Sequence, residues 1–302
     1  MITVIPQSSA LNPFQLSQLY NSNCLFQSSI SPIRVKFTLK RRRFHIQASS
    51  LVLPLLPFPI DQVLVPSEAK TLHLYEARYL ALLEEVKKSL ICFLSLFKKK
   101  KLFVHFVLDP IMLSETLEEA SFAARYGCLV KIEKVEQLEV GALVSIRGVS
   151  RVKILEFKQV EPHLTGVFIP QQDDVSLEIT EVHSKVLELK EALHSLNRLE
   201  IKLKVPQEAL MQTQTANSLI WAETALDLEC DNAFIPSVAE RVSFSALQVV
   251  SGGTKSEWLK LQKEKVRAME MKDTVERLNK SIELVKNNIN TVAAKLAIQS
   301  IR

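Results

Sequence analysis

The hydrophobic pattern of this chain changes from strand-like to helix-like at Asp173–Asp174, and this change constrains the fold more than any other feature. Before it, short apolar runs recur at roughly ten-residue spacing, which predicts a small, partly open β-barrel with one embedded helix. After it, apolar residues three and four apart predict a helical bundle with a long C-terminal helix. The sequence therefore predicts an α+β fold, with the barrel over residues 51–174 and the helices over residues 175–302.

The first half contains the predicted strands and the embedded helix. Residues 51–65 hold three prolines, so we expect an edge strand or an extended lead-in there. Residues 71–88 have apolar side chains near helical spacing and predict the helix. The other predicted strands are residues 102–108, 128–135, 142–147, 151–160 and 164–169, with the third and fourth hinged at Gly148. Four glycines lie at strand junctions, where a positive φ or a bulge is expected: Gly127, Gly141, Gly148 and Gly166.

The second half predicts helices over residues 175–199, 207–228 and 236–250, with Gly252–Gly253 as a stop. From Lys255 onward we expect one continuous helix. It contains an apolar seam with spacings of four and three, made by Met271, Val275, Leu278, Ile282, Val285, Ile289, Val292 and Leu296. A homodimeric coiled coil through this seam and a helix folded back on its own bundle explain the pattern equally well.

The amino-terminal segment differs in composition from the rest. Its first fifty residues hold six basic side chains, nine serines and no acid. Such a composition is typical of an organellar transit peptide, although a disordered arm has a similar one. The string Ile46-Gln47-Ala48, followed by two serines, is similar to a stromal processing site. We therefore expect a disordered transit peptide over residues 1–48 and a location in the chloroplast stroma, with the mitochondrion as second choice.

The remaining charges are balanced. Residues 51–174 carry 15 basic and 16 acidic side chains, and residues 175–302 carry 17 of each. A balanced surface lacks the general positive field that drives nucleic-acid binding through counterion release, so no nucleic-acid partner is expected. The longest apolar run, residues 90–97, is shorter than the roughly 18–20 residues that cross a bilayer, and four lysines follow it. No membrane span is expected.

Three blocks resemble the amino-terminal, substrate-binding domain of Lon proteases. Residues 72–80 read L-H-L-Y-E-A-R-Y-L, similar to the family signature LHIFEPRY. Residues 126–132 resemble its G-t-x-a-x-I strand, and residues 141–154 resemble its dG…v…G…RfrI block. The resemblance implies a PUA-like barrel followed by a helical bundle, and residues 236–242 more weakly resemble that second half. It assigns a structural role to His73, Tyr75, Glu76, Arg78, Tyr79, Gly127, Gly141, Gly148 and Arg151.

The chain departs from the family pattern at three places. Ala77 replaces the usual proline of the signature, and Ser67 replaces a common glycine before it. Residues 89–100 have no family counterpart, and we predict that their apolar part, residues 90–97, packs partly on the barrel. We also expect Arg78 and Glu76 to link the embedded helix to barrel loops, and Tyr75 and Tyr79 to pin that helix to the barrel.

A complete Lon protease needs an ATPase module and a Ser–Lys peptidase module, and the resemblance covers neither. The sequence contains no G-x-x-x-x-G-K-[ST] phosphate loop, no G-x-S-x-G elbow and no H-E-x-x-H, and its four cysteines are far apart. We therefore expect no catalytic residues, no cofactor and no metal site.

The sequence thus favours a non-catalytic polypeptide-recognition or adaptor protein of organellar protein quality control. Its expected partners are unfolded polypeptides, or a protease or chaperone to which it docks, with peptides adding to an exposed barrel edge. Three alternatives stay open: an RNA-binding PUA-like barrel, an enzyme of another type, and an oligomerisation module that uses the heptad seam.

Overall fold

The computed structural model describes residues 50–91, 101–111, 121–159, 161–174, 179–203, 213–226, 228 and 230–300. Residues Ser49–Arg302 form one compact unit. The predicted transit peptide and its processing site lie outside the described residues, as does most of the insert without a family counterpart. The domain boundary placed at residue 174 stays a prediction.

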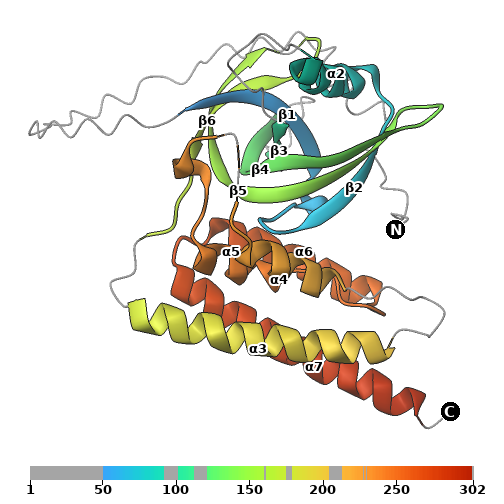
Figure 1. Ribbon diagram of the computed structural model, residues 1–302, viewed down its shortest axis with the longest axis vertical. Helices are drawn as coiled ribbons and strands as arrows, with labels where there is room; N and C mark the ends of the chain where they lie inside the picture. Colours follow the sequence, from blue (N-terminus) through green and yellow to red (C-terminus); the bar gives the residue numbers. More distant parts are fainter. Residues whose placement is uncertain are drawn as a thin grey trace, which may run out of the picture. The chain divides into compact units, whose positions relative to one another are not determined.

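Six strands form a sheet that closes on itself (Figure 1). They run in the order β2-β5-β4-β3-β1-β6, and β5 also pairs with β6 through its second half, which completes a ring of five strands. The second strand pairs with the first half of β5. The bounds are β1 (Leu51–Pro59), β2 (Ala69–Leu74), β3 (Leu102–Ile111), β4 (Ser121–Gln137), β5 (Ala142–Gln159) and β6 (Thr165–Pro170).

The first strand is not the edge strand that its prolines suggested. Residues Leu51–Pro54 pair antiparallel with β6, whereas residues Leu55–Pro59 pair parallel with β3. The first half of β1 therefore pairs with β6 on one side of the strand, and the second half pairs with β3 on the other side. Because proline lacks only the backbone N–H, a strand that changes partner midway can hold Pro54, Pro57 and Pro59 without leaving the sheet.

The embedded helix begins later than the sequence predicted. Residues 71–74 belong to β2 and pair with β5, and the helix α2 spans Ala77–Ile91. Its first turn begins at Glu76, whose carbonyl accepts hydrogen bonds from the backbone N–H groups of Tyr79 and Leu80. The prediction failed because Leu72 fits a helical spacing with Tyr75 and Tyr79, and equally fits a strand alternation with Leu74. The two strands predicted on either side of Gly148 are likewise one continuous strand, β5.

Alternate residues of the sheet contribute to separate apolar clusters. On one side, the helix α2 packs over the sheet through Leu82 and Leu83, against Phe103 and Ile146. A second cluster includes Val104 and Phe168 with Leu228 and with Phe234 of η2 (Asn232–Phe234). A third connects the sheet to the helices and contains Val63, Val65, Cys128, Phe244, Leu261 and Met269.

The helices form two layers beside the barrel. Figure 1 shows α4, α5 and α6 next to the sheet, with α3 and α7 beyond them. Their bounds are α3 (Ile179–Leu203), α4 (Gln214–Glu223), α5 (Val238–Ser245), α6 (Lys255–Glu270) and α7 (Thr274–Gln299). The predicted fold class, a small β-barrel with one embedded helix followed by helices that end in a long one, is confirmed.

The continuous helix predicted from Lys255 onward is wrong, because residues 271–273 separate α6 from α7. The Asp273 carboxylate caps α7 by accepting from the N–H groups of Val275 and Glu276. The carbonyl of Met271 turns instead toward two buried arginines, Arg151 and Arg277. These side-chain bonds replace the backbone bonds that a continuous helix would have made there.

The apolar seam of α7 is buried inside the chain. Leu278, Ile282 and Val285 pack in one cluster with Leu189 and Leu193 of α3. The helix therefore folds back on its own bundle, as one of the two sequence-based alternatives proposed. A homodimer through the same helix stays a prediction.

Candidate functional site

The barrel and the helices meet at four buried charged side chains, which we call the charged junction: Arg151, Asp173, Glu240 and Arg277. Their side chains are at most 7% exposed. Arg151 of β5 donates from Nε and Nη2 to Oε1 of Glu240 in α5, at 3.2 and 2.9 Å. Both arginines pair with Asp173, which also accepts a hydrogen bond from the Thr274 hydroxyl. Two positive and two negative charges thus balance each other away from water.

The remaining nitrogen atoms of the junction arginines also have partners. Nη1 of Arg151 donates to the carbonyls of Met269 and Met271, at 3.3 and 2.6 Å. Nε of Arg277 donates to the Ser243 hydroxyl at 2.7 Å. Both guanidinium groups lie near the ring of Phe244, at 5.6 and 4.5 Å from its centroid. Every guanidinium nitrogen of Arg151 and Arg277 therefore has a partner within the chain, and none is left for a ligand.

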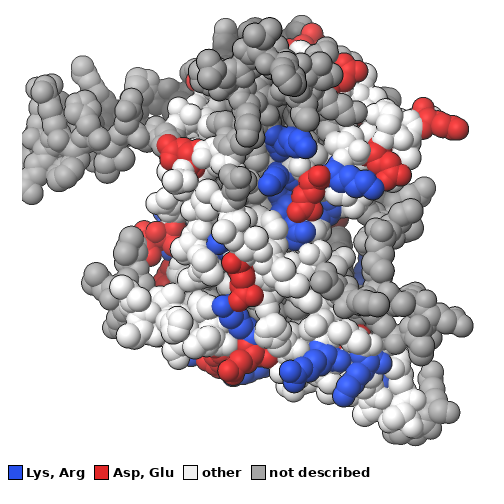
Figure 2. Space-filling view, in the orientation of Figure 1, with Lys and Arg blue, Asp and Glu red and all other residues white. Residues whose placement is uncertain are grey.

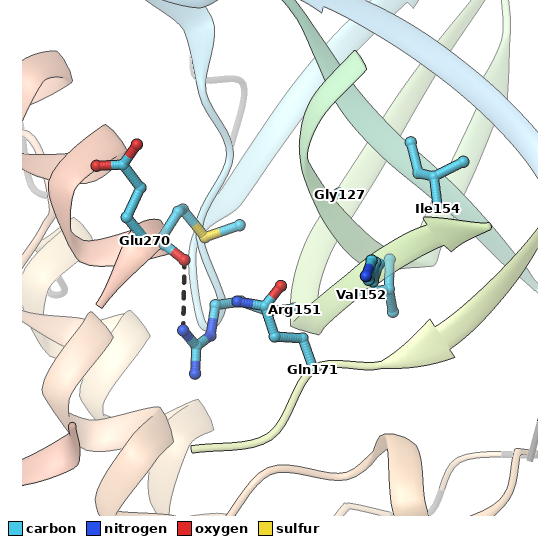
Figure 3. A pocket seen from close by; sticks show the side chains of 8 residues that line it. Gly127, Arg151, Val152, Ile154, Gln171 and Glu270 are labelled. Atoms are coloured by element: carbon cyan, nitrogen blue, oxygen red, sulfur yellow. Dashed lines mark hydrogen bonds between the residues drawn. The ribbon is translucent and has the colours of Figure 1, made fainter. Parts of the chain in front are cut away.

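A pocket of about 470 Å³ opens beside this junction (Figure 3). Val152 and Ile154 contribute from β5, and the carboxylate of Glu270 is directed away from the Arg151 guanidinium. The complete lining is Gly127, Arg151, Val152, Lys153, Ile154, Gln171, Met269 and Glu270. Because the Arg151 donors are already used, the lining offers the apolar side chains of Val152, Ile154 and Met269 together with the Gln171 amide. It also holds the charged side chains of Lys153 and Glu270, so the pocket is mixed in character.

The end of β2 brings together another group of motif residues. Nε2 of His73 lies 3.0 Å from the carbonyl of Val140, and the His73 ring centroid lies 5.7 Å from that of Tyr75. Gly141 has a φ of 84°, and a Cβ there would lie 2.4 Å from the carbonyl oxygen of Leu74. Glycine is therefore required in this turn, which places Val140 beside the end of β2.

One of the predicted roles of the signature residues needs correction. Arg78 donates from Nε to Glu76 at 2.7 Å, so the two side chains pair with each other at the start of the helix, and their predicted link to barrel loops stays a prediction. They can meet because Glu76 precedes the first helical residue, so the rule for helical neighbours does not apply to it. Tyr79 packs against the α2 cluster as expected. Tyr75 lies outside the helix and is 47% exposed, so it does not pin the helix.

The other predicted glycines allow close backbone approach and lack a positive φ, and Gly148 lies at an irregularity of the β4–β5 register, where a bulge was the second expectation. A Cβ at Gly148 would lie 2.2 Å from the carbonyl oxygen of Val65, and one at Gly127 would lie 2.8 Å from that of Val152. Gly148 also exchanges backbone hydrogen bonds with the connection before β2, through Ser67 and Glu68. The connection between β1 and β2 therefore lies directly against β5 at this point.

Burial shifts the ionisation of several groups near these sites. It raises the pKa of Glu240, an effect that the Asp173 charge strengthens and that Arg151 and Arg277 oppose. It raises the pKa of the Cys128 thiol well above its usual value, which keeps the thiol protonated and unreactive. It holds the pKa of His105 well below its ordinary value, so that this imidazole is neutral at pH 7.

The described residues contain no group of three or more His, Cys, Asp or Glu side chains that could hold a metal ion. Within the same part of the chain, no helix combines the length and the hydropathy of a membrane span. Figure 2 shows Lys and Arg interspersed with Asp and Glu on the face in view, with uncharged surface between them.

Fold and sites together define a β-barrel protein with a helical second half. Residues 52–232 match the substrate-binding domain of the ATP-dependent protease La (LON), and the chain belongs to this family. The match ends before α5, so the helices that hold Glu240, Lys265 and Arg277 lie beyond it. It is the one domain found in the chain, and no protease or ATPase domain is detected.

Two solved structures are among those similar to this chain. The Lon N-terminal domain protein from Xanthomonas campestris is 17% identical, with a TM-score of 0.37, over 76% of this chain and 96% of that one. The N-terminal domain of Mycobacterium avium complex Lon protease is 16% identical, with a TM-score of 0.40, over 78% of this chain and 98% of that one. Among curated protein sequences, none matches this chain significantly.

Sequence reasoning missed three of the four junction residues. Asp173 was used only as a boundary, Glu240 only as part of a weak family block, and Arg277 not at all. The one available signal was Arg277, a charged residue directly beside the apolar seam position Leu278. Its partner Asp173 lies 104 residues away along the chain, and its partner Ser243 lies 34 residues away. The spacing of residues in the sequence does not indicate contacts over such separations.

Proposed function

We propose that this protein binds other polypeptides without cleaving them, as a recognition or adaptor protein of organellar protein quality control. The observation that carries the proposal is the match of residues 52–232 to the Lon substrate-binding domain. The pocket beside the charged junction is compatible with it, because its lining combines apolar side chains with polar groups, as a peptide segment also does. The partners are unfolded polypeptides, or a protease or chaperone that receives them.

The composition of the first fifty residues supports a location in the chloroplast stroma, with the mitochondrion as the second candidate. Import of the radiolabelled full chain into isolated chloroplasts tests this proposal. The expected product is shorter, protease-protected and starts at Ser49. Import into mitochondria alone, or no import at all, would overturn it.

A binding experiment tests the function itself. The purified full chain is mixed with fluorescent, reduced and carboxymethylated α-lactalbumin, which stays unfolded, and with the native form of the same protein. We expect binding of the unfolded form alone, with no new fragments after incubation with ATP. Fragments without an added protease, or equal affinity for both forms, would contradict the proposal.

RNA binding is the competing function, and the same preparation tests it with a fluorescent single-stranded RNA. Phosphate contacts make RNA binding weaken steeply as salt rises. We expect RNA to bind at least tenfold more weakly than the unfolded protein. Tighter RNA binding with a steep salt dependence would replace polypeptide recognition by the RNA-binding alternative.

A further inference from the structure

The second strand has an unpaired edge. Among the described strands, β2 alone has a single neighbour, because it pairs with β5 over Ala69–Leu74 while each of the others pairs with two. No other described element runs alongside it. The exposed edge that the sequence placed in β1 is therefore in β2, which is six residues long and overlaps the family signature at residues 72–74.

The backbone groups that face this edge follow from the pairing. Residues of an antiparallel pair alternate between those that exchange hydrogen bonds and those that do not. The N–H of Gly148 donates to the carbonyl of Glu68, so residues 70, 72 and 74 also bond to β5. The N–H and C=O groups of Ala69, Thr71 and His73 then point toward the free edge.

This edge has one of the devices that usually limit strand addition, a lysine, and lacks two others. Natural proteins protect edges with proline, with bulges and with charged side chains, lysine above all. Residues Ala69–Leu74 contain no proline, and their register with β5 shows no shift, whereas the β3–β4, β4–β5 and β5–β6 pairings are all irregular. The one charged side chain, Lys70, is turned to Gln62 and to the ring of Phe58.

Apolar surface lies at the end of the same edge. Tyr75 is 47% exposed and Val140 is 71% exposed, and His73 connects them through its contacts with both. The nearby charges of Glu76 and Arg78 neutralise each other. A segment that adds beside β2 would therefore meet the exposed side chains of Tyr75 and Val140 at this end.

We propose that β2 is the binding site for the polypeptide client, which adds as an extended strand along Ala69–Leu74 with an apolar residue against Tyr75 and Val140. This inference rests on the proposed function and identifies where that function takes place. The client's backbone supplies most of the bonds, so an extended segment with β-branched or aromatic residues is recognised with low sequence specificity.

A proline substitution tests the proposal. Thr71→Pro removes the central outward N–H, and an edge strand tolerates proline at such a position. We expect it to bind unfolded α-lactalbumin at least tenfold more weakly than the wild type, while Thr71→Val, which keeps the N–H, stays within twofold. Circular dichroism and the unfolding midpoint check that both variants fold. Undiminished binding by a folded Thr71→Pro overturns the edge site.

Modified peptides keep the test independent of protein folding. The probe is fluorescein-labelled Lys-Val-Thr-Val-Thr-Val-Thr-Val-Lys, made unmodified, N-methylated at its valines, or N-methylated at its threonines. If the peptide adds as a strand, at least one methylated peptide should bind tenfold more weakly than the unmodified one. Binding of the unmodified peptide should also slow amide hydrogen exchange at Ala69, Thr71 and His73. Equal binding of all three peptides overturns the proposal.

These experiments distinguish a failure of the proposed β2 site from a failure of the proposed function. A full chain that binds neither the peptide nor unfolded α-lactalbumin contradicts the proposed function as well. The function is retained, but at another site, if the wild type binds both probes and Thr71→Pro binds them equally well. Loss of binding in Ile154→Asp would then place the client in the pocket beside the charged junction.

Discussion

Lys265 of α6 and Glu68 of the β1–β2 connection form an ion pair at 2.6 Å, although 197 residues separate them in the chain. The Lys265 side chain is 2% exposed and that of Glu68 is 13% exposed. The second carboxylate oxygen of Glu68 accepts the N–H of Val65, and its carbonyl accepts the N–H of Gly148. One residue thus holds the turn before β2, the strand β5 and the helix α6 together.

We expect Lys265→Met to destabilise the protein by about 3 kcal/mol, because it leaves a buried carboxylate without its partner. Lys280→Met is the matched control, since its pair with Glu276 is about half exposed and contributes at most ~1 kcal/mol. Urea denaturation measures both variants. Equal losses of stability would contradict a structural role for the buried pair.

Asp173 joins both junction arginines, so Asp173→Asn should cost about 3–5 kcal/mol, as expected when a buried pair loses one partner. The neighbouring Asp174 is exposed, and Asp174→Asn should change stability by less than about 0.5 kcal/mol. Thermal and urea unfolding of the full chain compare the two. A neutral Asp173→Asn would show that the junction arginines find other partners.

Gly148→Ala should destabilise the barrel by about 1–3 kcal/mol, because the added Cβ meets a backbone carbonyl that cannot move away easily. Gly253→Ala is the control, as its nearest backbone atom lies at 3.2 Å and its neighbour at 3.8 Å is the end of a Glu257 side chain. The urea midpoint reports both. Equal losses of stability in the two variants would contradict the prediction. They would show that the nearby Val65 carbonyl does not require glycine at position 148.

Stability should fall in acid because of His105. Burial and the nearby charges of Lys70 and Lys265 lower its folded-state pKa well below 6.5, and its Nε2 accepts the N–H of Leu64 at 3.1 Å. Below pH 6.5 the unfolded state binds a proton that the folded state does not bind, so stability is lost as the pH decreases.

The expected contribution of His105 is a loss of about 1 kcal/mol between pH 6.5 and 5.5. His105→Gln retains a hydrogen-bond acceptor but does not titrate. Between pH 6.5 and 5.5 the variant should therefore lose about 1 kcal/mol less stability than the wild type. Denaturation curves at several pH values give the difference, in which the contributions of other groups cancel. Parallel pH profiles would contradict the assignment.

The fold class could be predicted from local pattern, because it depends on the spacing of apolar residues within each segment. Alternation indicated the strand at residues 128–135, which lies in β4, and spacing of four and three indicated the apolar seam of α7. The same reasoning failed at residues 71–74, where the apolar spacing suits both a helix and a strand. It failed again at Met271–Asp273, where side chains from other elements replace the bonds of a continuous helix.

The sequence alone determined the fold class and the signature of the Lon substrate-binding family. Only the tertiary structure decided that β1 is paired in both halves, that β2 is the free edge, and that Arg151 joins Glu240, Asp173 and the end of α6. The physical reason is that backbone pairing and ion pairs connect residues far apart in the chain. Their partners become neighbours only once the barrel has closed and the helices have packed on it.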